Sequence, residues 1–274
     1  MNNKCNNFSV LISVYNKDNP FYFDVALHSI YAKQSLKPDQ IVIVADGHLT
    51  DKQNSIISSF RSNCDKDIVT VVSISENVGL AEALNEGLRH CKNELVARMD
   101  ADDISLPERF EKQVAFMKSH PDIDVCGTHI DEIEPETEQY ISTRKVPLNH
   151  EDIYKFSKKR NPISHPSVIF KKSKILELGG YPSFKKSQDF ALWSLMLVNG
   201  AKFANLEDIL LRMRTGNNMM IRRGLAYFKY EFDVLRYQRR INFLSIFEFI
   251  INCIIRFLVR VLPVTIKKII YKNR

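Results

Sequence analysis

The 274-residue sequence has few cysteines and a single tryptophan. None of its five cysteines belongs to a Cys-x-x-Cys pair or lies beside histidines at the spacing of a metal site. This argues against a zinc module or a disulfide framework, and it indicates a reducing, cytosolic compartment. No apolar signal-peptide core precedes the first strand-like stretch, so we expect no export by that route.

Repeats and low-complexity tracts are also missing, and 45% hydrophobic with 26% charged residues is the balance of a globular protein. The net charge of +7 is unevenly distributed. Residues 222–274 hold 12 Lys and Arg and 3 Asp and Glu, whereas residues 1–221 hold 27 and 29. Nucleic-acid-binding proteins spread basic residues over the face that follows the phosphates, so the sequence argues against nucleic acid as a partner.

Apolar, β-branched stretches alternate with helical patterns over the first hundred residues. The patterns predict strands at residues 8–14, 40–45, 68–73 and 95–99. They predict helices at about 20–34, 50–62 and 79–90, and further helices at 107–119 and 188–199. Shorter strands are expected near Val125 and at 141–146. This alternation predicts an α/β fold with a mostly parallel sheet covered by helices on both faces.

The polar residues that end these strands mark the expected ligand site, because ligands of parallel sheets bind at the carboxyl ends of the strands. These residues are Tyr15, Asn16, Asp46, Glu76, Asn77, Asp100, Asp102 and Asp103.

Three of them form a carboxylate cluster directly after a predicted strand: Asp100, Asp102 and Asp103. Such carboxylates repel one another unless a cation or hydrogen-bond donors bind them. Mg²⁺ typically takes one or two carboxylates together with phosphate oxygens, so the cluster suggests a metal that holds a diphosphate. The alternative is a helix cap at Asp102 or Asp103, before Leu106 and Pro107, but a cap needs one acid rather than three.

Five motifs, in this order, resemble those of the family 2 glycosyltransferases, nucleotide-sugar-dependent enzymes of bacterial polysaccharide assembly with the Rossmann-like GT-A fold. The resemblance covers about residues 8–215. The motifs are Val10-Leu11-Ile12-Ser13-Val14-Tyr15-Asn16, Asp46-Gly47, Asn77-Val78-Gly79-Leu80-Ala81 with Asn85, Asp100-Ala101-Asp102-Asp103, and Gln188-Asp189-Phe190-Ala191-Leu192-Trp193.

The resemblance implies a nucleotide pocket at the first three strand ends. Ser13 and Tyr15 would line it, with the Tyr15 ring beside the base, and Asp46 would accept the uracil N3–H. Asn77 and Gly79 would approach the ribose or diphosphate, where glycine permits close backbone contact. Without the family, the segments around Asp46 and Asn77 would be ordinary turns.

The resemblance also implies that Asp100 faces the ribose and that Asp102 binds Mn²⁺ or Mg²⁺, with Asp103 as a further ligand contact or the cap. Arg98 would pair with these acids or with phosphate, and a structural ion pair is the alternative. Asp189 would be the general base of an inverting transfer. Its alternative role is a helix-start acid favoured by the macrodipole.

The acceptor side is predicted to include His165, Gln188, Trp193 and Arg214. Gln188 replaces a Glu found in many relatives, which removes a charge beside the proposed base. A loop histidine without a catalytic task is the alternative for His165. Arg212, Arg214 and the Arg222-Arg223-Gly224 turn would reach a diphosphate, or else form a solvated basic face.

Residues 241–266 are rich in Ile, Phe, Leu and Val, yet they contain a stripe of polar side chains four residues apart: Glu248, Asn252, Arg256 and Arg260, with Ser245 in the same sector. The stripe predicts an amphipathic helix in the membrane interface rather than a spanning helix, because buried charges are costly there. The side chains predicted to face lipid are Phe243, Phe247, Ile250, Ile251, Ile254, Phe257 and Leu258. The residues predicted to contact anionic headgroups are Lys267, Lys268, Lys272 and Arg274. The alternative is a helix packed on the catalytic domain with its polar stripe outward.

We therefore expect a catalytic domain over residues 1–220, with a nucleotide-sugar half to about 105 and an acceptor half from 106, and a basic membrane-associating tail over 221–274. The resemblance implies inverting transfer of glucose or galactose from a UDP-sugar to a GlcNAc- or GalNAc-diphosphoundecaprenol lipid. The product would be a β1,3 linkage in O-antigen assembly, made by a peripheral protein at the cytoplasmic face of the bacterial inner membrane.

Two other functions remain open at this point. A sugar nucleotidyltransferase would be expected to carry a Gly-rich loop with Lys or Arg after the first strand, and residues 15–19 lack one. A non-catalytic membrane-surface protein on the same fold would not need both Asp102 and Asp189. The sequence does not predict the oligomeric state.

Overall fold

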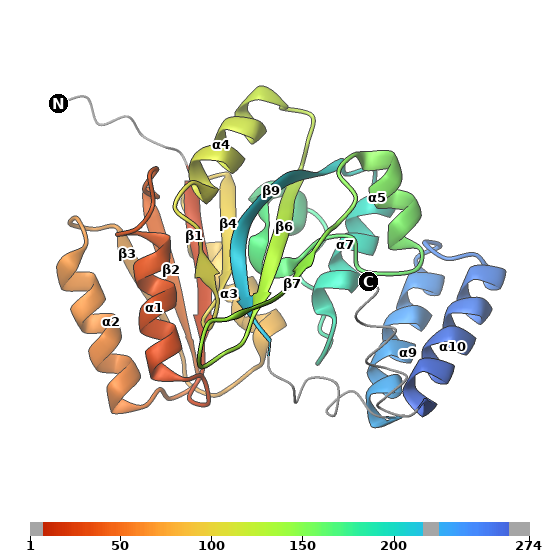
Figure 1. Cartoon of the computed structure of the whole chain (residues 1–274), viewed down its shortest axis with the longest axis horizontal. Coiled ribbons are helices and arrows are strands. Elements are labelled where there is room, and N and C mark those ends of the chain that lie inside the picture. Colours follow the sequence, from red (N-terminus) through yellow and green to blue (C-terminus); the bar gives the residue numbers. More distant parts are fainter. Residues whose placement is uncertain (1–7, 216–224, 263–274) are drawn as a thin grey trace.

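A computed structural model describes residues 8–215 and 225–262, which are built around one nine-stranded sheet (Figure 1). The strands are β1 (Phe8–Val14), β2 (Gln40–Asp46), β3 (Val69–Ile74), β4 (Leu95–Asp100), β5 (Ile104–Ser105), β6 (Val125–Ile133), β7 (Tyr140–Arg144), β8 (Ile169–Lys171) and β9 (Phe203–Arg214). The helices are α1 (Pro20–Ile30), α2 (Asp51–Asn63), α3 (Leu80–His90), α4 (Arg109–Ser119), α5 (His150–Ser157), α6 (Lys172–Leu176), α7 (Gln188–Val198), α9 (Leu225–Arg240) and α10 (Ile246–Val261), with a short 3₁₀ turn, η1, at His165–Ser167.

The sheet has the order β3-β2-β1-β4-β8-β6-β9-β5, and β7 pairs with β6. The first four strands are parallel, as predicted. β8 then joins β4 and β6 in antiparallel pairing, whereas β6 and β9 are parallel. The α/β prediction is confirmed, with parallel pairing concentrated in the half of the sheet that holds the candidate nucleotide site.

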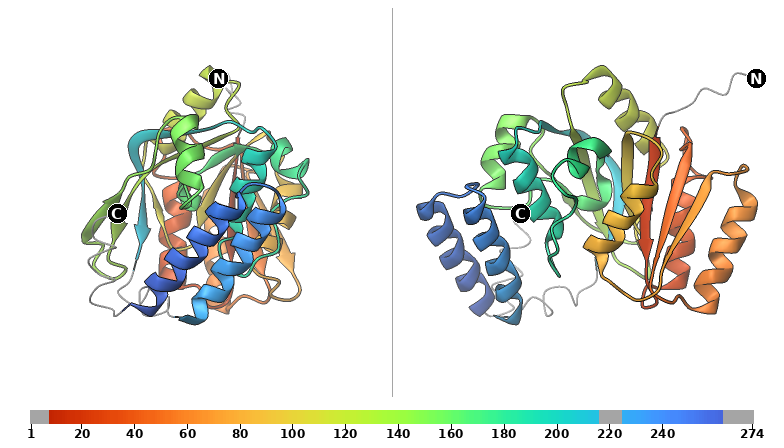
Figure 2. Two further views of the ribbon diagram at one scale, coloured as in Figure 1. Left: turned by 90° about the vertical axis from the view of Figure 1, so that its right-hand side faces the viewer. Right: turned by 180° about the vertical axis from the view of Figure 1, so that it is seen from behind.

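Helices cover both faces of the sheet, with α1 and α4 on one face and α3 and α7 on the other (Figures 1 and 2). Val10 and Ile12 of β1 pack into one buried cluster, and Leu11 packs into the other. Successive side chains of a strand point to opposite faces, so a wholly apolar strand contributes to both clusters. The largely apolar runs of β1 and β2 are explained by this burial.

The helix starts follow local capping rules. Asn19 accepts a hydrogen bond from the Phe21 amide and precedes the proline that begins α1, and Thr50 forms a capping box with Gln53 at the start of α2. α1 ends at Ile30 rather than at the predicted Gln34. The Gln34 side chain turns inward and donates to the carbonyl oxygens of Ser29 and Leu106, so the chain leaves the helix early.

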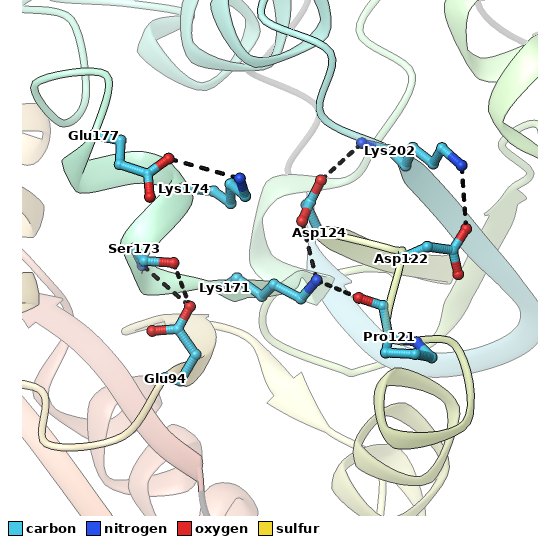
Figure 3. A network of polar contacts seen from close by, with 9 residues as sticks. All are labelled: Glu94, Pro121, Asp122, Asp124, Lys171, Ser173, Lys174, Glu177 and Lys202. Atoms are coloured by element: carbon cyan, nitrogen blue, oxygen red, sulfur yellow. Dashed lines mark hydrogen bonds and ion pairs between the residues drawn. The ribbon is translucent and has the colours of Figure 1, made fainter.

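A polar network joins β4, β6, β8 and β9 at the end of the sheet away from Asp100 (Figure 3). Asp124 accepts hydrogen bonds from the Lys202 amide at 3.0 Å and from Lys171 Nζ at 3.1 Å. Glu94, just before β4, accepts from Ser173 Oγ at 2.5 Å. Because it connects strands from distant parts of the sequence and lies far from the predicted site, we assign this network a structural role.

The tail helices α9 and α10 lie side by side and pack next to α7 (Figures 1 and 2). Leu235, Phe243 and Leu244 are buried in the same cluster as Trp193 of α7. Phe243 was predicted to face lipid, and this is wrong. It precedes α10, in a turn that inserts its ring into the core, and its carbonyl oxygen accepts a hydrogen bond from Lys158.

The polar stripe of α10 faces the protein. Asn252 Nδ2 donates to the Lys158 carbonyl at 2.9 Å. Arg256 and Arg260 both pair with Glu231 of α9, at 3.2 and 2.6 Å. The alternative prediction, a helix packed on the catalytic domain with its polar stripe outward, is therefore wrong about the orientation. These polar side chains are largely buried, and their partners, Lys158 and Glu231, belong to the folded body.

Two sets of predicted residues lie outside the described ranges: Arg222, Arg223 and Gly224, and Lys267, Lys268, Lys272 and Arg274. The boundary predicted at residue 220 also falls there. Among the helices that the structure describes, none combines the length and apolar character needed to cross a membrane.

Candidate active site

The carboxyl ends of β1, β2 and β4 meet at one edge of the sheet. Ser13 of β1 lies opposite Asp100 of β4 on one side and Val44 of β2 on the other. Tyr15 follows β1 and is 38% exposed, and Asp46 is the last residue of β2. The structure therefore gathers Ser13, Tyr15, Asp46 and Asp100 at the edge where the sequence predicted a ligand site.

A tight turn after β1 holds an acid that the sequence interpretation missed. Asp18 Oδ2 accepts from the Tyr15 amide at 3.0 Å, and Gln53 Nε2 donates to the carbonyl oxygens of both residues. Burial raises the pKa of Asp18 to about 7, and the charges of Asp102, Asp100 and Asp46 raise it further. In the sequence, Asp18 lies in a polar loop and has the features of an ordinary turn residue.

Asp46 joins the end of β2 to the loop before α3. Its carboxylate accepts from the Val78 amide at 2.7 Å, from the Gly79 amide at 3.1 Å and from Asn77 Nδ2 at 2.9 Å. Gly47 has φ of +85°, and a Cβ there would lie 2.9 Å from the Asn77 nitrogen, so only glycine allows this close approach. A carboxylate offers about four acceptor positions, so Asp46 retains capacity for a further donor.

Asp100, Asp102 and Asp103 form the predicted cluster, with one oxygen from each within 4.8 Å of the others. Burial raises the pKa of Asp102 to about 6, and the neighbouring Asp100 adds to the rise. Burial raises the pKa of Asp103 well above its usual range, and Asp102 and Asp100 again add to it. A divalent cation would relieve the crowding of these hard oxygen donors, and the raised pKa values of Asp102 and Asp103 reflect their burial and that crowding, so the cluster fits Mn²⁺ or Mg²⁺.

The helix-cap alternative for Asp102 or Asp103 is wrong. The next residues form β5, which pairs with β9, and α4 begins only at Arg109, with Glu108 at its N-cap. Asp103 is instead buried and accepts a hydrogen bond from the Arg214 amide at 3.0 Å, across 111 residues of sequence.

Arg98 lies beneath the cluster, 1% exposed, and pairs with Asp100. Among the residues that the structure describes, its Nε and Nη1 have no hydrogen-bond partner. A second buried arginine, Arg109, donates to the Arg98 carbonyl at 2.7 Å. Burial lowers the pKa of Arg109 to about 9, and the charge of Arg98 lowers it further. The ion pair that was the alternative for Arg98 therefore forms with Asp100, and two buried nitrogens of the same guanidinium have no partner among the described residues.

Asp189 lies in the first turn of α7, where Asn161 Nδ2 donates to its Oδ2 at 2.5 Å. Burial raises the pKa of Asp189, whereas the hydrogen bonds from the Phe190 amide and Asn161 and the charge of Arg98 lower it. Asn161 is a second residue that the sequence interpretation missed, because nothing in its local pattern distinguishes it from a loop asparagine. Arg98 thus acts electrostatically on both Asp100 and Asp189.

A buried chain of contacts links α3 to the loop before α7. Asn85 donates to the Tyr181 carbonyl at 3.0 Å and accepts from the Tyr181 amide at 2.6 Å. The Tyr181 hydroxyl lies 3.0 Å from His165 Nε2. Burial lowers the pKa of His165 well below its usual range, and Arg98 adds to this effect, so the ring is neutral. This loop leads to Asp189 and ties it to the nucleotide-side helix.

The residues predicted for the acceptor side take up different positions. Trp193 is fully buried and packs edge-on to His165, with ring centroids 5.9 Å apart, so both are core residues beneath the site. Gln188 is also buried, at the start of α7. Arg214 pairs with Glu138 at 2.6 Å, and its guanidinium lies over the Tyr22 ring. Arg212 is exposed and lies opposite Ile104 of β5.

Known proteins resemble this chain over most of its length. The family described as "Glycosyl transferase family 2" matches residues 9–227. The chain is 38% identical over 268 residues to the "UDP-Gal:alpha-D-GlcNAc-diphosphoundecaprenol beta-1,3-galactosyltransferase" of Escherichia coli, covering 97% of this chain and 95% of that protein. It is 34% identical to the "Amylovoran biosynthesis glycosyltransferase AmsE" of Erwinia amylovora, covering 97% and 98%.

Two solved structures have a similar fold. The crystal structure of S. aureus TarS 1-349 aligns with a TM-score of 0.64 at 19% identity, covering 92% of this chain and 71% of that chain. The mannosyltransferase PcManGT from Pyrobaculum calidifontis, in complex with GDP-Man and Mn²⁺, aligns with a TM-score of 0.64 at 17% identity, covering 85% and 64%. The predicted GT-A arrangement is thereby confirmed.

Proposed function

Because this chain belongs to glycosyl transferase family 2, we propose that it transfers a hexose from a UDP-sugar to a lipid-linked sugar with inversion at the anomeric carbon. One observation carries the mechanism. An acid cluster at the end of β4 and a separate acid at the start of α7 lie around one buried arginine, whose charge acts on both. Inverting transfer needs these two acidic centres, one for the leaving diphosphate and one for the attacking hydroxyl.

The edge formed by β1 and β2 would bind the UDP part of the donor. Asp46 is held by the Asn77–Gly79 loop and retains acceptor capacity for the uracil N3–H. Tyr15 offers a partly exposed ring, and Ser13 a hydroxyl, at the adjoining strand end. A hollow of about 410 Å³ borders the loop, lined in part by Gly47, His48, Asn54 and Ser75.

Asp102 and Asp100 would hold Mn²⁺ or Mg²⁺, with Asp103 as a third oxygen donor. When bound, the cation neutralises the negative charge that develops on the leaving UDP. Arg98 is paired with Asp100, and its buried Nε and Nη1 have no hydrogen-bond partner in the described part of the chain, so they would be available to a diphosphate held beside Asp100. Its fixed charge would stabilise the same leaving group.

Asp189 would act as the general base. The acceptor hydroxyl attacks the anomeric carbon from the face opposite UDP, the bond from that carbon to UDP breaks, and the hydroxyl proton passes to the Asp189 carboxylate. Burial raises the pKa of Asp189, which makes it a stronger base than an exposed aspartate, and Asn161 holds the carboxylate in one orientation. His165 is neutral and contacts the Tyr181 hydroxyl, so its role would be to position Tyr181 and not to transfer protons.

The name of the E. coli relative supports galactose from UDP-galactose as donor sugar, a GlcNAc-diphosphoundecaprenol acceptor and a β1,3 linkage. The proposal also includes glucose as the transferred sugar and a GalNAc-diphosphoundecaprenol acceptor. An acceptor of this kind lies in a membrane, so the reaction would take place at the cytoplasmic face of the bacterial inner membrane. The product would be a repeat unit of O-antigen or a related polysaccharide.

The experiment is transfer from UDP-galactose, UDP-glucose, UDP-GlcNAc and UDP-GalNAc to synthetic GlcNAc- and GalNAc-diphospholipids. We expect one UDP-hexose to react, with EDTA abolishing turnover. Asp189→Asn should reduce kcat by about 10²–10⁴-fold while UDP still binds. Asp152→Asn, an exposed acid in the first turn of α5, is the matched control and should leave kcat unchanged. If Asp189→Asn transfers the sugar at a rate near that of wild type, Asp189 is not the general base.

A further inference from the structure

α10 presents an unbroken apolar surface away from the protein. Nine of its side chains are between 45% and 76% exposed, and all are aliphatic or aromatic. We call this the α10 apolar face, and it consists of Ile246, Phe247, Ile250, Ile251, Ile254, Ile255, Phe257, Leu258 and Val261. Monomeric soluble proteins rarely expose a contiguous apolar patch of this kind, which marks an interaction surface.

The polar side of α10 fixes the helix in this orientation. Arg260 is 6% exposed at its side chain and forms two hydrogen bonds with Glu231 of α9, and Arg256 pairs with the same carboxylate. Asn252 binds the Lys158 carbonyl. Turning the apolar face inward would break this buried ion cluster and leave charges without partners, which is strongly unfavourable. The outward apolar face is therefore a stable feature of the fold.

We propose that the α10 apolar face lies in the interface of a membrane that contains anionic lipids. The face carries no polar group, whereas specific protein interfaces carry about one hydrogen bond per 100–200 Å² and a polar rim. The sequence that follows α10, residues 262–274, contains four Lys and Arg and no Asp or Glu. Basic residues that follow an apolar helix in the sequence favour negatively charged headgroups over another copy of this basic tail.

The position of α10 agrees with such a membrane contact. It runs along one side of the molecule, and its carboxyl-terminal end lies at the same end as the carboxyl ends of β1 and β4 (Figures 1 and 2). The helix would lie flat in the interface while the ion cluster ties it to the folded body. The inference does not depend on the proposed donor or acceptor, since it rests only on the surface of α10 and the charge of the chain after it.

The test is flotation of the full-length protein with vesicles of phosphatidylethanolamine and phosphatidylglycerol, and with vesicles of phosphatidylcholine alone. The double variant F247S/I251S removes two exposed side chains, 76% and 54% accessible, without touching the core. We expect its partition coefficient on the anionic vesicles to fall about tenfold or more, and wild-type binding to weaken on phosphatidylcholine. Y140S/I141S, which changes two residues of β7 that are 64% and 51% exposed, is the matched control and should bind as wild type.

Two further measurements distinguish a membrane from a second copy of the protein as the partner of the α10 apolar face. Circular dichroism and UDP binding of F247S/I251S should match wild type, which shows that lost flotation is a surface effect. Light scattering without vesicles should give a monomer for both proteins. Unchanged flotation of F247S/I251S, equal wild-type binding to both vesicle types, or a wild-type dimer that this variant dissociates would each overturn the proposal.

Discussion

Asn161→Ala should shift the acidic limb of the pH–rate profile to higher pH. Asn161 Nδ2 donates to the Asp189 carboxylate at 2.5 Å, and this bond lowers the Asp189 pKa against the larger effect of burial, which raises it. Without the donor the charged form loses part of its stabilisation, so protonation becomes easier. Because the proposed base works only when deprotonated, activity will be lost at pH values where wild type is still active.

The size of the shift follows from the strength of the bond. A hydrogen bond to a charged group contributes about 1.5–3 kcal/mol, and one pKa unit corresponds to about 1.36 kcal/mol. Removing the Asn161 donor should therefore raise the pKa of Asp189 by about 1–2 units. Asn161→Asp should raise it at least as far, because a second carboxylate beside Asp189 opposes its ionisation.

The assay is kcat/KM from UDP release between pH 5 and 9, since this parameter reports the pKa values of the free enzyme. Asn149→Ala is the matched control, because Asn149 also bonds an aspartate, Asp152, at an exposed helix start. Its profile should coincide with wild type. If the acidic limb of Asn161→Ala also coincides with wild type while kcat falls, then Asp189 is not the titrating base and the reasoning is wrong.

Three further changes test other parts of the structure. Asp102→Asn should lower kcat about 100-fold or more and weaken Mn²⁺ binding, measured by titration calorimetry, while metal-free UDP binding persists. Glu231→Gln should cost about 3–5 kcal/mol of stability in thermal unfolding, because it leaves Arg260 buried without its charged partner, whereas Lys112→Met at an exposed pair should cost less than about 1 kcal/mol. Gln188→Glu should move the acidic limb to higher pH by adding a charge beside the base, and an unmoved limb would show that the two residues do not interact.

The strands and their ends could be predicted because both depend on local sequence. β1, β2 and β4 are largely apolar runs that end at or just before a polar residue. Parallel pairing then places Ser13, Asp46 and Asp100 at one edge. The spacing of the carboxylates within residues 100–103 was enough to indicate a cation site.

The missed residues depend on contacts between distant parts of the chain. Asn161 meets Asp189 across 28 positions, and the acid cluster raises the pKa of Asp18 from residues more than 80 positions away. Asp103 illustrates the converse error. Its local sequence is typical of a helix cap, but β5 pairs with β9 and the side chain binds the Arg214 amide instead. The hydrogen bond between distant residues therefore outweighs the local preference of Asp103 for a helix start.

α10 shows why an amphipathic pattern alone does not determine orientation. The spacing of Glu248, Asn252, Arg256 and Arg260 predicts a polar stripe, and the usual assumption places such a stripe in water. Here the partner of the two arginines is Glu231, which lies on α9 and is 25 and 29 positions away. A buried carboxylate with two arginines is stable only if all three stay together, whereas exposed apolar side chains lose favourable burial but leave no charge unpaired. The ion cluster therefore decides which side of α10 faces the protein, and the apolar side is left for an external partner.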